Sequence, residues 1–248
     1  MNLGMNVALS MEALLRSDPL VGAAFWSAAT VGFYLLAKAV YRRWPRWWLL
    51  PLGSTPALLI IAVLLLDTSY SEYIRGTHWL VALLGPAVVA FAVPIYQRRA
   101  LIRRHWPLLA FGMVVGSATA VASSWGFATL LGLDGALRLS LLPRSISTPF
   151  AMTVSSEIGG IPDLTAVFVV MTGVLGAVLG EVVLAWLPLR STIARGSLFG
   201  MGAHGAGTAR AYEVGAEEGA IAGLVMVLVG LLNVLLAPLM VIAFARLG

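Results

Sequence analysis

Residues 200–213, GMGAHGAGTARAYE, place four glycines, a histidine, a threonine, an arginine and a glutamate between strongly apolar parts of the chain. In lipid, backbone that is not helical survives only where it is buried in protein or lines a water-filled cavity. The stretch therefore predicts a broken helix that faces other protein rather than hydrocarbon. Whether lipid surrounds this break depends on the composition of the rest of the chain.

The composition is that of an integral membrane protein. Of 248 residues, 60% are hydrophobic and 11% are charged, and the mean hydropathy is +0.93, whereas a soluble domain carries about 25% charged residues. The isoelectric point near 10.1 does not indicate a nucleic-acid partner, because the basic residues lie in loops between apolar runs. The chain has no cysteine, which excludes disulfides and thiolate metal sites, and no metal or other cofactor is expected.

Apolar runs of spanning length define the fold class, since a spanning helix needs about 20 mostly apolar residues. Two further apolar segments are interrupted, 136–154 by LLPRSISTP and 192–211 by the glycine-rich stretch at 200–213. We predict an all-α polytopic membrane protein with about seven transmembrane helices plus re-entrant or discontinuous helices. Residues 20–248 are expected to form one transmembrane domain, and 1–19 a non-membrane or interfacial segment. The uncharged runs are 20–37, 47–66, 79–96, 107–133, 164–180 and 219–245.

Loop charges predict the orientation. Lysine and arginine residues crowd the loops at 38–46 and 98–104, which the positive-inside rule places in the cytoplasm, with the N-terminus outside. If 136–154 enters and returns on one face, Arg190 and Arg195 also reach the cytoplasm; if it spans, they do not. Its prolines disfavour a continuous helix, so we favour the re-entrant interpretation. That gives seven crossings, unless 200–213 is itself part of a re-entrant segment.

A short internal similarity suggests a structural repeat. LLGPAVVAFAVP at 83–94 resembles LLPRSISTPFAMTV at 141–154, and each precedes a short linker and a Gly/Ala-rich helix. Paired interrupted segments are typical of transporters built from repeats around a central site. The alternative is a chance similarity between two apolar stretches.

Three polar islands, 85–94, 143–149 and 200–215, suggest a site for a small anion. Broken helices expose N–H groups at their new N-termini, and these attract anions. Arginine adds a planar fork of donors that suits a carboxylate, and glycine lets a ligand approach the backbone closely. The candidate residues are Arg210 for the carboxylate, His204 and Thr208 for hydrogen bonds to it, Gly205 and Gly207 for close approach, and Ser147, Thr148 and Pro149 in the facing turn.

Each candidate also has an interpretation without a ligand. Arg210 can pair with Glu213 one helical turn away at the membrane surface, and Arg144 can extend to the headgroups from the mouth of a hairpin. Hydroxyls such as those of Ser147 and Thr148 often bond to a carbonyl of their own helix. Enzyme motifs such as HExxH, GxSxG and GxxxxGK are absent from the sequence, so we expect no catalytic activity.

Three blocks resemble the LrgB/CidB family of bacterial membrane proteins: SISTPFAM (145–152), SSEIGGIPDLTAVFVVMTGVLGAVLGE (155–181) and ARGSLFGMGAHGAGTARAYEVGAEEGA (194–220). The resemblance implies a multi-pass protein of the bacterial inner membrane with a small partner of the LrgA/CidA type. The chain departs from the family pattern at Ala203, where a serine is expected, and at Glu157. The first departure removes a hydroxyl from the expected site.

The resemblance implies two functions. The first is secondary transport of small monocarboxylates, because plastid relatives are glycolate/glycerate translocators and bacterial members are linked to pyruvate-like acids. The alternative is an antiholin-like regulator of murein hydrolase activity and autolysis that acts with the LrgA-type partner. Homo-oligomers are compatible with either function.

Overall fold

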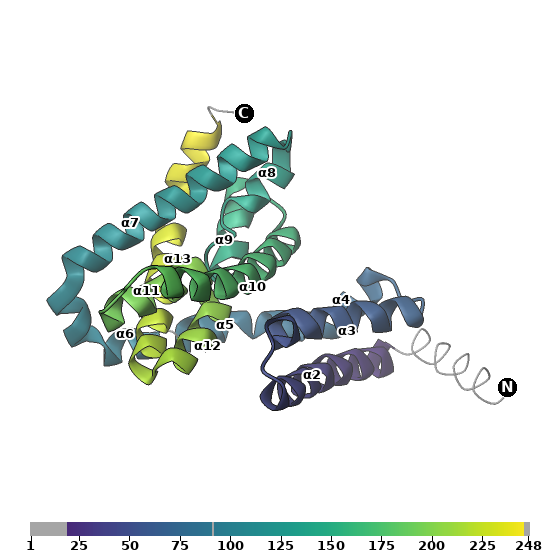
Figure 1. The fold of residues 1–248 in the computed structure, drawn as a ribbon. Coiled ribbons are helices and arrows are strands. Elements are labelled where there is room, and N and C mark those ends of the chain that lie inside the picture. Colours follow the sequence, from purple (N-terminus) through teal and green to yellow (C-terminus); the bar gives the residue numbers. More distant parts are fainter. Residues whose placement is uncertain (1–18, 91, 246–248) are drawn as a thin grey trace, which may run out of the picture. The chain divides into compact units, whose positions relative to one another are not determined.

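The computed structural model describes residues 19–90 and 92–245, so the segment expected at 1–19 lies, except for Pro19, outside the described residues (Figure 1). The described chain consists of helices and their connections, which confirms the all-α prediction. It divides into two compact units, residues 1–87 and 88–248.

The first unit contains α2 (Pro19–Arg43), the short 3₁₀ helix η1 (Trp47–Leu49), α3 (Pro51–Leu65) and α4 (Tyr70–Ala82). Helices α2 and α4 pack closely because Gly76 has no side chain; a Cβ there would lie 3.0 Å from the Ala23 Cα. Polar bonds join the same pair, since Ser27 donates to the Gly76 carbonyl at 3.0 Å and accepts from the Trp79 ring N–H at 2.7 Å. Small residues and interhelical hydrogen bonds of this kind hold helices together in lipid.

Helix α5 (Leu84–Ala90) spans the boundary between the units, and the second unit continues with α6 (Ala92–Gln97) and α7 (Arg99–Leu130). Pro86, which has no N–H to continue the helical hydrogen bonds, explains why α4 does not continue into α5. The long helix α7 is kinked at His105, two residues before Pro107, as expected where a proline removes a backbone donor.

Two helical hairpins follow the same pattern, each coming after a long helix. After α7, α8 (Gly135–Leu141) and α9 (Thr148–Ile158) form the first; after α10 (Pro162–Trp186), α11 (Thr192–Gly202) and α12 (His204–Val214) form the second. Helix α13 (Ala216–Ala245) completes the unit. The helices of the two hairpins have 7 or 11 residues, and 11 residues extend only about 16 Å, roughly half of the hydrocarbon thickness. None of them is long enough to cross a membrane alone, which fits the re-entrant interpretation of 136–154 and a discontinuous helix at 192–211.

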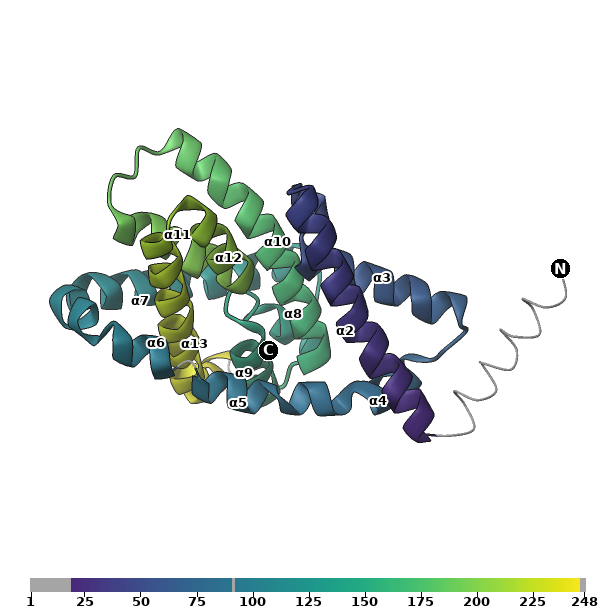
Figure 2. The same cartoon turned by 90° about the horizontal axis from the view of Figure 1, so that it is seen from below.

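The two hairpins pack against opposite ends of α10, as Figure 2 shows. At the N-terminal end, the Thr165 hydroxyl donates to the Ser140 carbonyl at 2.9 Å, and the Ser140 hydroxyl accepts from the Ile161 amide at 2.7 Å. Toward the C-terminal end, Gly176 and Gly180 of α10 lie against the second hairpin, where a Cβ on Gly180 would meet the Phe199 ring at 2.6 Å. The repeated pattern of a long helix and a hairpin covers residues 99–214, which differs from the predicted similarity between 83–94 and 141–154.

Among the described residues, four helices are long and apolar enough to cross a membrane: Leu20–Arg43, Arg99–Leu130, Pro162–Trp186 and Ala216–Phe244. The prediction of about seven crossings also relied on 47–66 and 79–96, where α3 and α4 have only 15 and 13 residues. The run at 79–96 does not form one helix because α4, which starts at Tyr70 after the capping box of Ser69 and Glu72, ends at Ala82, ahead of Pro86.

The core of the second unit lies between the first hairpin and α13. Leu142, Ile146, Phe150 and Val154 are buried together with Val225 and Val229 of α13. Phe150 packs directly on Gly230, where a Cβ would overlap its ring. This contact fixes α9 against the middle of α13, and it thereby fixes the position of the turn that precedes α9.

Candidate functional site

The turn of the first hairpin, residues 142–147, brings Arg144 beside the middle of α10. The Arg144 Nε donates to the Ser124 hydroxyl of α7 at 2.8 Å, and one terminal nitrogen lies 3.4 Å from the Thr172 hydroxyl of α10. Among the described residues no carboxylate lies within salt-bridge distance of this guanidinium. The turn therefore carries a full positive charge whose described side-chain partners are two neutral hydroxyls.

The second hairpin turns at Ala203 and His204. His204 has a backbone φ of 37°, the left-handed region that L-residues rarely adopt and that costs about 1–3 kcal/mol. This conformation allows α12 to start directly after α11, with only Ala203 between them. The backbone of the hairpin is therefore strained at the residue that carries its imidazole.

The two turns meet through this imidazole, which is 3% exposed and forms a hydrogen bond with the backbone of Arg144. The Arg144 amide already donates to the Leu141 carbonyl at 3.3 Å, so its carbonyl is the group left for His204. Because a carbonyl only accepts, and because His204 Nε2 has no partner among the described residues, Nδ1 carries the proton. Nε2 is then a buried acceptor with no described partner.

Two glycines of α10 allow this meeting. A Cβ at Gly173 would lie 2.7 Å from the His204 Cε1, and a Cβ at Gly176 would overlap the Gly202 carbonyl oxygen. Both glycines therefore serve close packing between helices. Since they lie at the middle of a 25-residue helix, the turns of both hairpins lie at the middle of a spanning segment.

Two helix N-termini start at these turns. Helix α9 begins at Thr148 after the N-cap residue Ser147, and α12 begins at His204; each helix has 11 residues. The Ser147 hydroxyl is buried and has no partner among the described residues, because Pro149 at the second helical position has no N–H to offer it. Helix N-termini carry positive partial charge, which adds to the charge of Arg144.

A hollow of about 450 Å³ opens beside the Arg144 guanidinium. Its polar lining comes from Ser124, Arg144 and Thr172, and the backbone of Gly176 and Gly202 borders it; leucine, phenylalanine and methionine side chains complete the wall. Ser124 and Thr172 were not singled out from the sequence, because single hydroxyls in apolar helices usually bond within the helix.

The remaining predicted site residues lie away from the contact between the two turns or bond to other partners. Thr208 donates to the His204 carbonyl of its own helix at 2.9 Å, the alternative without a ligand. Arg210 lies near the far end of α12, where it pairs with Glu213 and with Glu181 of α10. Gly205 is exposed, whereas Gly207 packs on the Phe199 carbonyl. Thr148 and Pro149 are partly buried at the start of α9.

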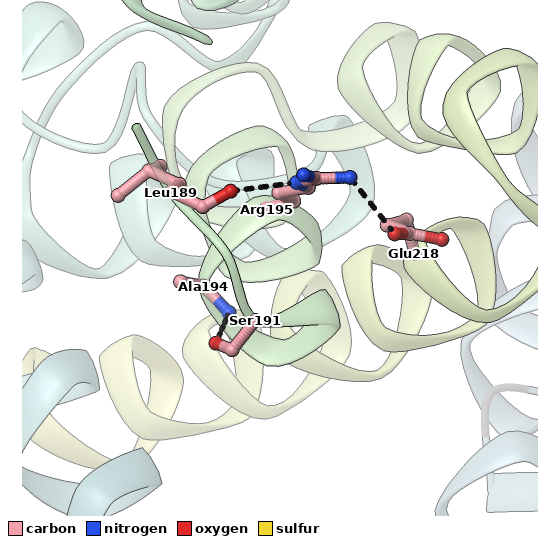
Figure 3. A network of polar contacts seen from close by, with 5 residues as sticks. All are labelled: Leu189, Ser191, Ala194, Arg195 and Glu218. Carbon is pink, nitrogen blue, oxygen red and sulfur yellow. Dashed lines mark hydrogen bonds and ion pairs between the residues drawn. The ribbon is translucent and has the colours of Figure 1, made fainter. Parts of the chain in front are cut away.

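The mouth of the second hairpin is fixed by a polar network (Figure 3). The Arg195 Nε donates to the Leu189 carbonyl at 2.8 Å, and a terminal nitrogen lies 3.8 Å from the buried Glu218 carboxylate. The Ser191 hydroxyl accepts from the Ala194 amide at 3.0 Å and so caps α11. Glu218 is therefore part of the contacts that hold the mouth of the hairpin in place.

The fold and site define a multi-pass membrane protein with two half-length hairpins that meet beside a long apolar helix. The chain belongs to the LrgB-like family, whose model matches residues 30–243, and this confirms the resemblance seen in the three sequence blocks.

The chain is similar to named relatives over most of its length. It is 42% identical to the Bacillus subtilis protein YwbG, over 84% of this chain and 93% of the relative, and 37% identical to B. subtilis YxaC, over 87% and 94%. It is 29% identical to the holin-like protein CidB of Staphylococcus aureus, over 87% and 94%. No solved structure matches the chain.

Proposed function

We propose that this protein is an antiholin-like regulator of murein hydrolase activity and autolysis. The support is the likeness to proteins described as holin-like, which favours this function over solute transport. Such a role implies a small membrane partner of the LrgA or CidA type. The regulator and its partner would form a stable complex in the membrane.

Deletion of the gene in its host tests this proposal. We expect a changed rate of autolysis, restored by the wild-type gene on a plasmid, and co-purification of a small LrgA-type membrane protein with the tagged chain. An unchanged lysis rate together with a chain that purifies alone would contradict the proposal.

One feature of the structure favours a second function, transport of a small monocarboxylate. Arg144 holds a charge at the middle of a spanning segment with only neutral side-chain partners among the described residues. Uncompensated charge at such depth is costly, and charged residues inside membrane proteins usually pair with each other or mark a substrate path. A carboxylate in the adjoining hollow would supply the missing negative charge.

The donor set around Arg144 suits an anion of the size of glycolate, glycerate or pyruvate. A guanidinium can bind both carboxylate oxygens at once, and two helix N-termini add positive potential from opposite sides of the membrane. In this proposal Arg144 takes the carboxylate-binding role first expected for Arg210, whose charge is already balanced by two glutamates. Ser147 and His204, whose buried polar atoms have no described partner, bind the ligand when the turns separate.

The same geometry suggests how a solute crosses. The turns touch through one hydrogen bond and glycine contacts, whereas the outer end of each hairpin is anchored, as Arg195 and Glu218 anchor the second. Movement of one turn away from α10 would open the hollow toward one side without breaking the outer anchors. Alternating movement of the two turns would expose the same arginine to each side in turn.

Uptake of labelled glycolate or pyruvate into proteoliposomes that contain only the purified chain tests the transport proposal. We expect saturable uptake that unlabelled substrate competes away. A regulator that moves no solute would give no uptake above empty liposomes, and that result would leave the antiholin-like role as the function.

A further inference from the structure

Gly202, the last residue of α11, borders two separate hollows. One is the hollow that contains Arg144. The other, of about 480 Å³, follows α11 between α7 and α13, and Leu109, Met113, Ser197 and Val225 contribute to its wall. The two hollows therefore approach each other at the backbone of one residue in the turn of the second hairpin.

Neither backbone conformation nor packing requires a glycine at this position. The glycines with left-handed backbone among the described residues are Gly132, Gly135 and Gly159. A Cβ at Gly202 would meet no atom within 4 Å, whereas a Cβ at Gly200 or Gly207 would overlap the backbone of a neighbouring segment. Glycine also disfavours helix by about 1 kcal/mol relative to alanine. What glycine provides here is free space beside the backbone, which allows close approach of a ligand.

We infer that Gly202 is the size-limiting position of the solute path, where an anion held by Arg144 passes the turn of the second hairpin into the hollow along α11. The inference rests on the proposed transport function. Its physical basis is that a side chain at 202 would project into open space rather than into the protein. Substitution therefore narrows the path without a clash in the packed structure.

Because the chain has no cysteine, a single Gly202→Cys thiol can be labelled selectively in liposomes, and this does not depend on transport. We expect a sulfonate-bearing methanethiosulfonate to react about tenfold faster than a trimethylammonium one, because the arginine attracts anions to the hollow. Arg144→Gln should abolish this preference. Gly126→Cys is the matched control, since that glycine also faces open space but borders a hollow without charged side chains.

Uptake then tests the size limit. Gly202→Ala should reduce uptake of a four-carbon carboxylate more than that of a two-carbon one, and Gly202→Leu should reduce both at least about tenfold, while Gly126→Leu leaves both unchanged. A Gly202→Cys thiol without anion preference, or full uptake by Gly202→Leu, overturns the inference while wild-type uptake still supports transport. Absence of uptake by the wild type removes the transport function instead, and with it the role of Gly202 in that function.

Discussion

Arg144 and Arg210 belong to the two hairpins of one unit, yet their surroundings are opposite. Arg210 lies near the outer end of α12, about one-third exposed, and pairs with two glutamates. Arg144 lies in the inner turn of the first hairpin and contacts the hydroxyls of Ser124 and Thr172. The arginine in the more conspicuous sequence motif therefore has its charge balanced, and the arginine in the plainer turn does not.

This difference shows that the balance of charge around an arginine does not follow from the sequence motif in which it lies. Exposed ion pairs contribute about 0–1 kcal/mol, so Arg210 adds little more than attachment of α12 to α10. Arg144 is partly buried and has no counter-charge among the described residues, which is costly; in the transport proposal a bound anion offsets this cost. Substitutions at and around the two arginines test this contrast, from the largest expected effect to the smallest.

Neutralising each arginine in turn should reduce carboxylate uptake or binding to different extents. Hydrogen bonds to charged groups contribute about 1.5–3 kcal/mol, so Arg144→Gln should lower carboxylate uptake or binding about tenfold to a hundredfold. Arg210→Gln, the matched control, should change either quantity less than about twofold. Uptake of labelled carboxylate into proteoliposomes that contain either variant at equal protein density measures the difference. A larger loss of uptake with Arg210→Gln than with Arg144→Gln would contradict the assignment of the two arginines.

The support of the Arg144 turn should be sensitive to a single methyl group on α10. In Gly173→Ala the new Cβ would lie 2.7 Å from the His204 Cε1, so the imidazole must shift away from the Arg144 carbonyl. We expect a loss of about 1–3 kcal/mol in unfolding free energy, the usual cost of overpacking. Unfolding in detergent measures it, with Gly126→Ala as the control that meets open space. Equal stability of the two variants would show that the turns do not touch α10 as described.

Removal of one hydroxyl partner of Arg144 should weaken carboxylate binding without abolishing it. Ser124→Ala deletes an acceptor at 2.8 Å; because the charge itself remains, carboxylate binding loses less than the roughly 1.5–3 kcal/mol of a direct hydrogen bond to a charged group. With its guanidinium less well oriented, the variant should bind the carboxylate about threefold to tenfold more weakly. Titration of binding by the purified variant tests this, beside Ser123→Ala, whose hydroxyl donates to a carbonyl of its own helix. No difference between the two variants would remove Ser124 from the site.

The smallest effect is expected for the glutamates that balance Arg210. Glu181→Gln removes one carboxylate partner of Arg210, and the Glu181 side chain is itself 46% exposed; Glu213 remains as the other partner. We expect less than about 1 kcal/mol of destabilisation, measured by thermal unfolding at low and high salt. Uptake into proteoliposomes should be unchanged. A large loss of uptake would show that the outer pair belongs to the path.

The sequence was sufficient for the class of protein, the family and the positions of the two breaks. Apolar length, proline and glycine act locally, so LPRSISTP and GMGAHGAG predict interrupted helices without knowledge of the fold. The sequence could not predict which of the two arginines has its charge balanced. Glu213 is visible three residues after Arg210, but Glu181 and the hydroxyls of Ser124 and Thr172 come from other helices. Hydropathy also did not show that α3 and α4 have only 15 and 13 residues.

The central claim is that the turns of the two hairpins meet beside the middle of α10, and solid-state NMR tests it directly. The chain has only three histidines, so ring ¹⁵N labelling of histidine with carbonyl ¹³C labelling of arginine can detect the contact of His204 with Arg144. We predict a dipolar coupling that corresponds to about 4 Å, the N···C separation across an N–H···O=C bond, and its loss in Arg144→Lys, which carries no label at that carbonyl. A His204 ring without this coupling in the wild-type protein would contradict the account.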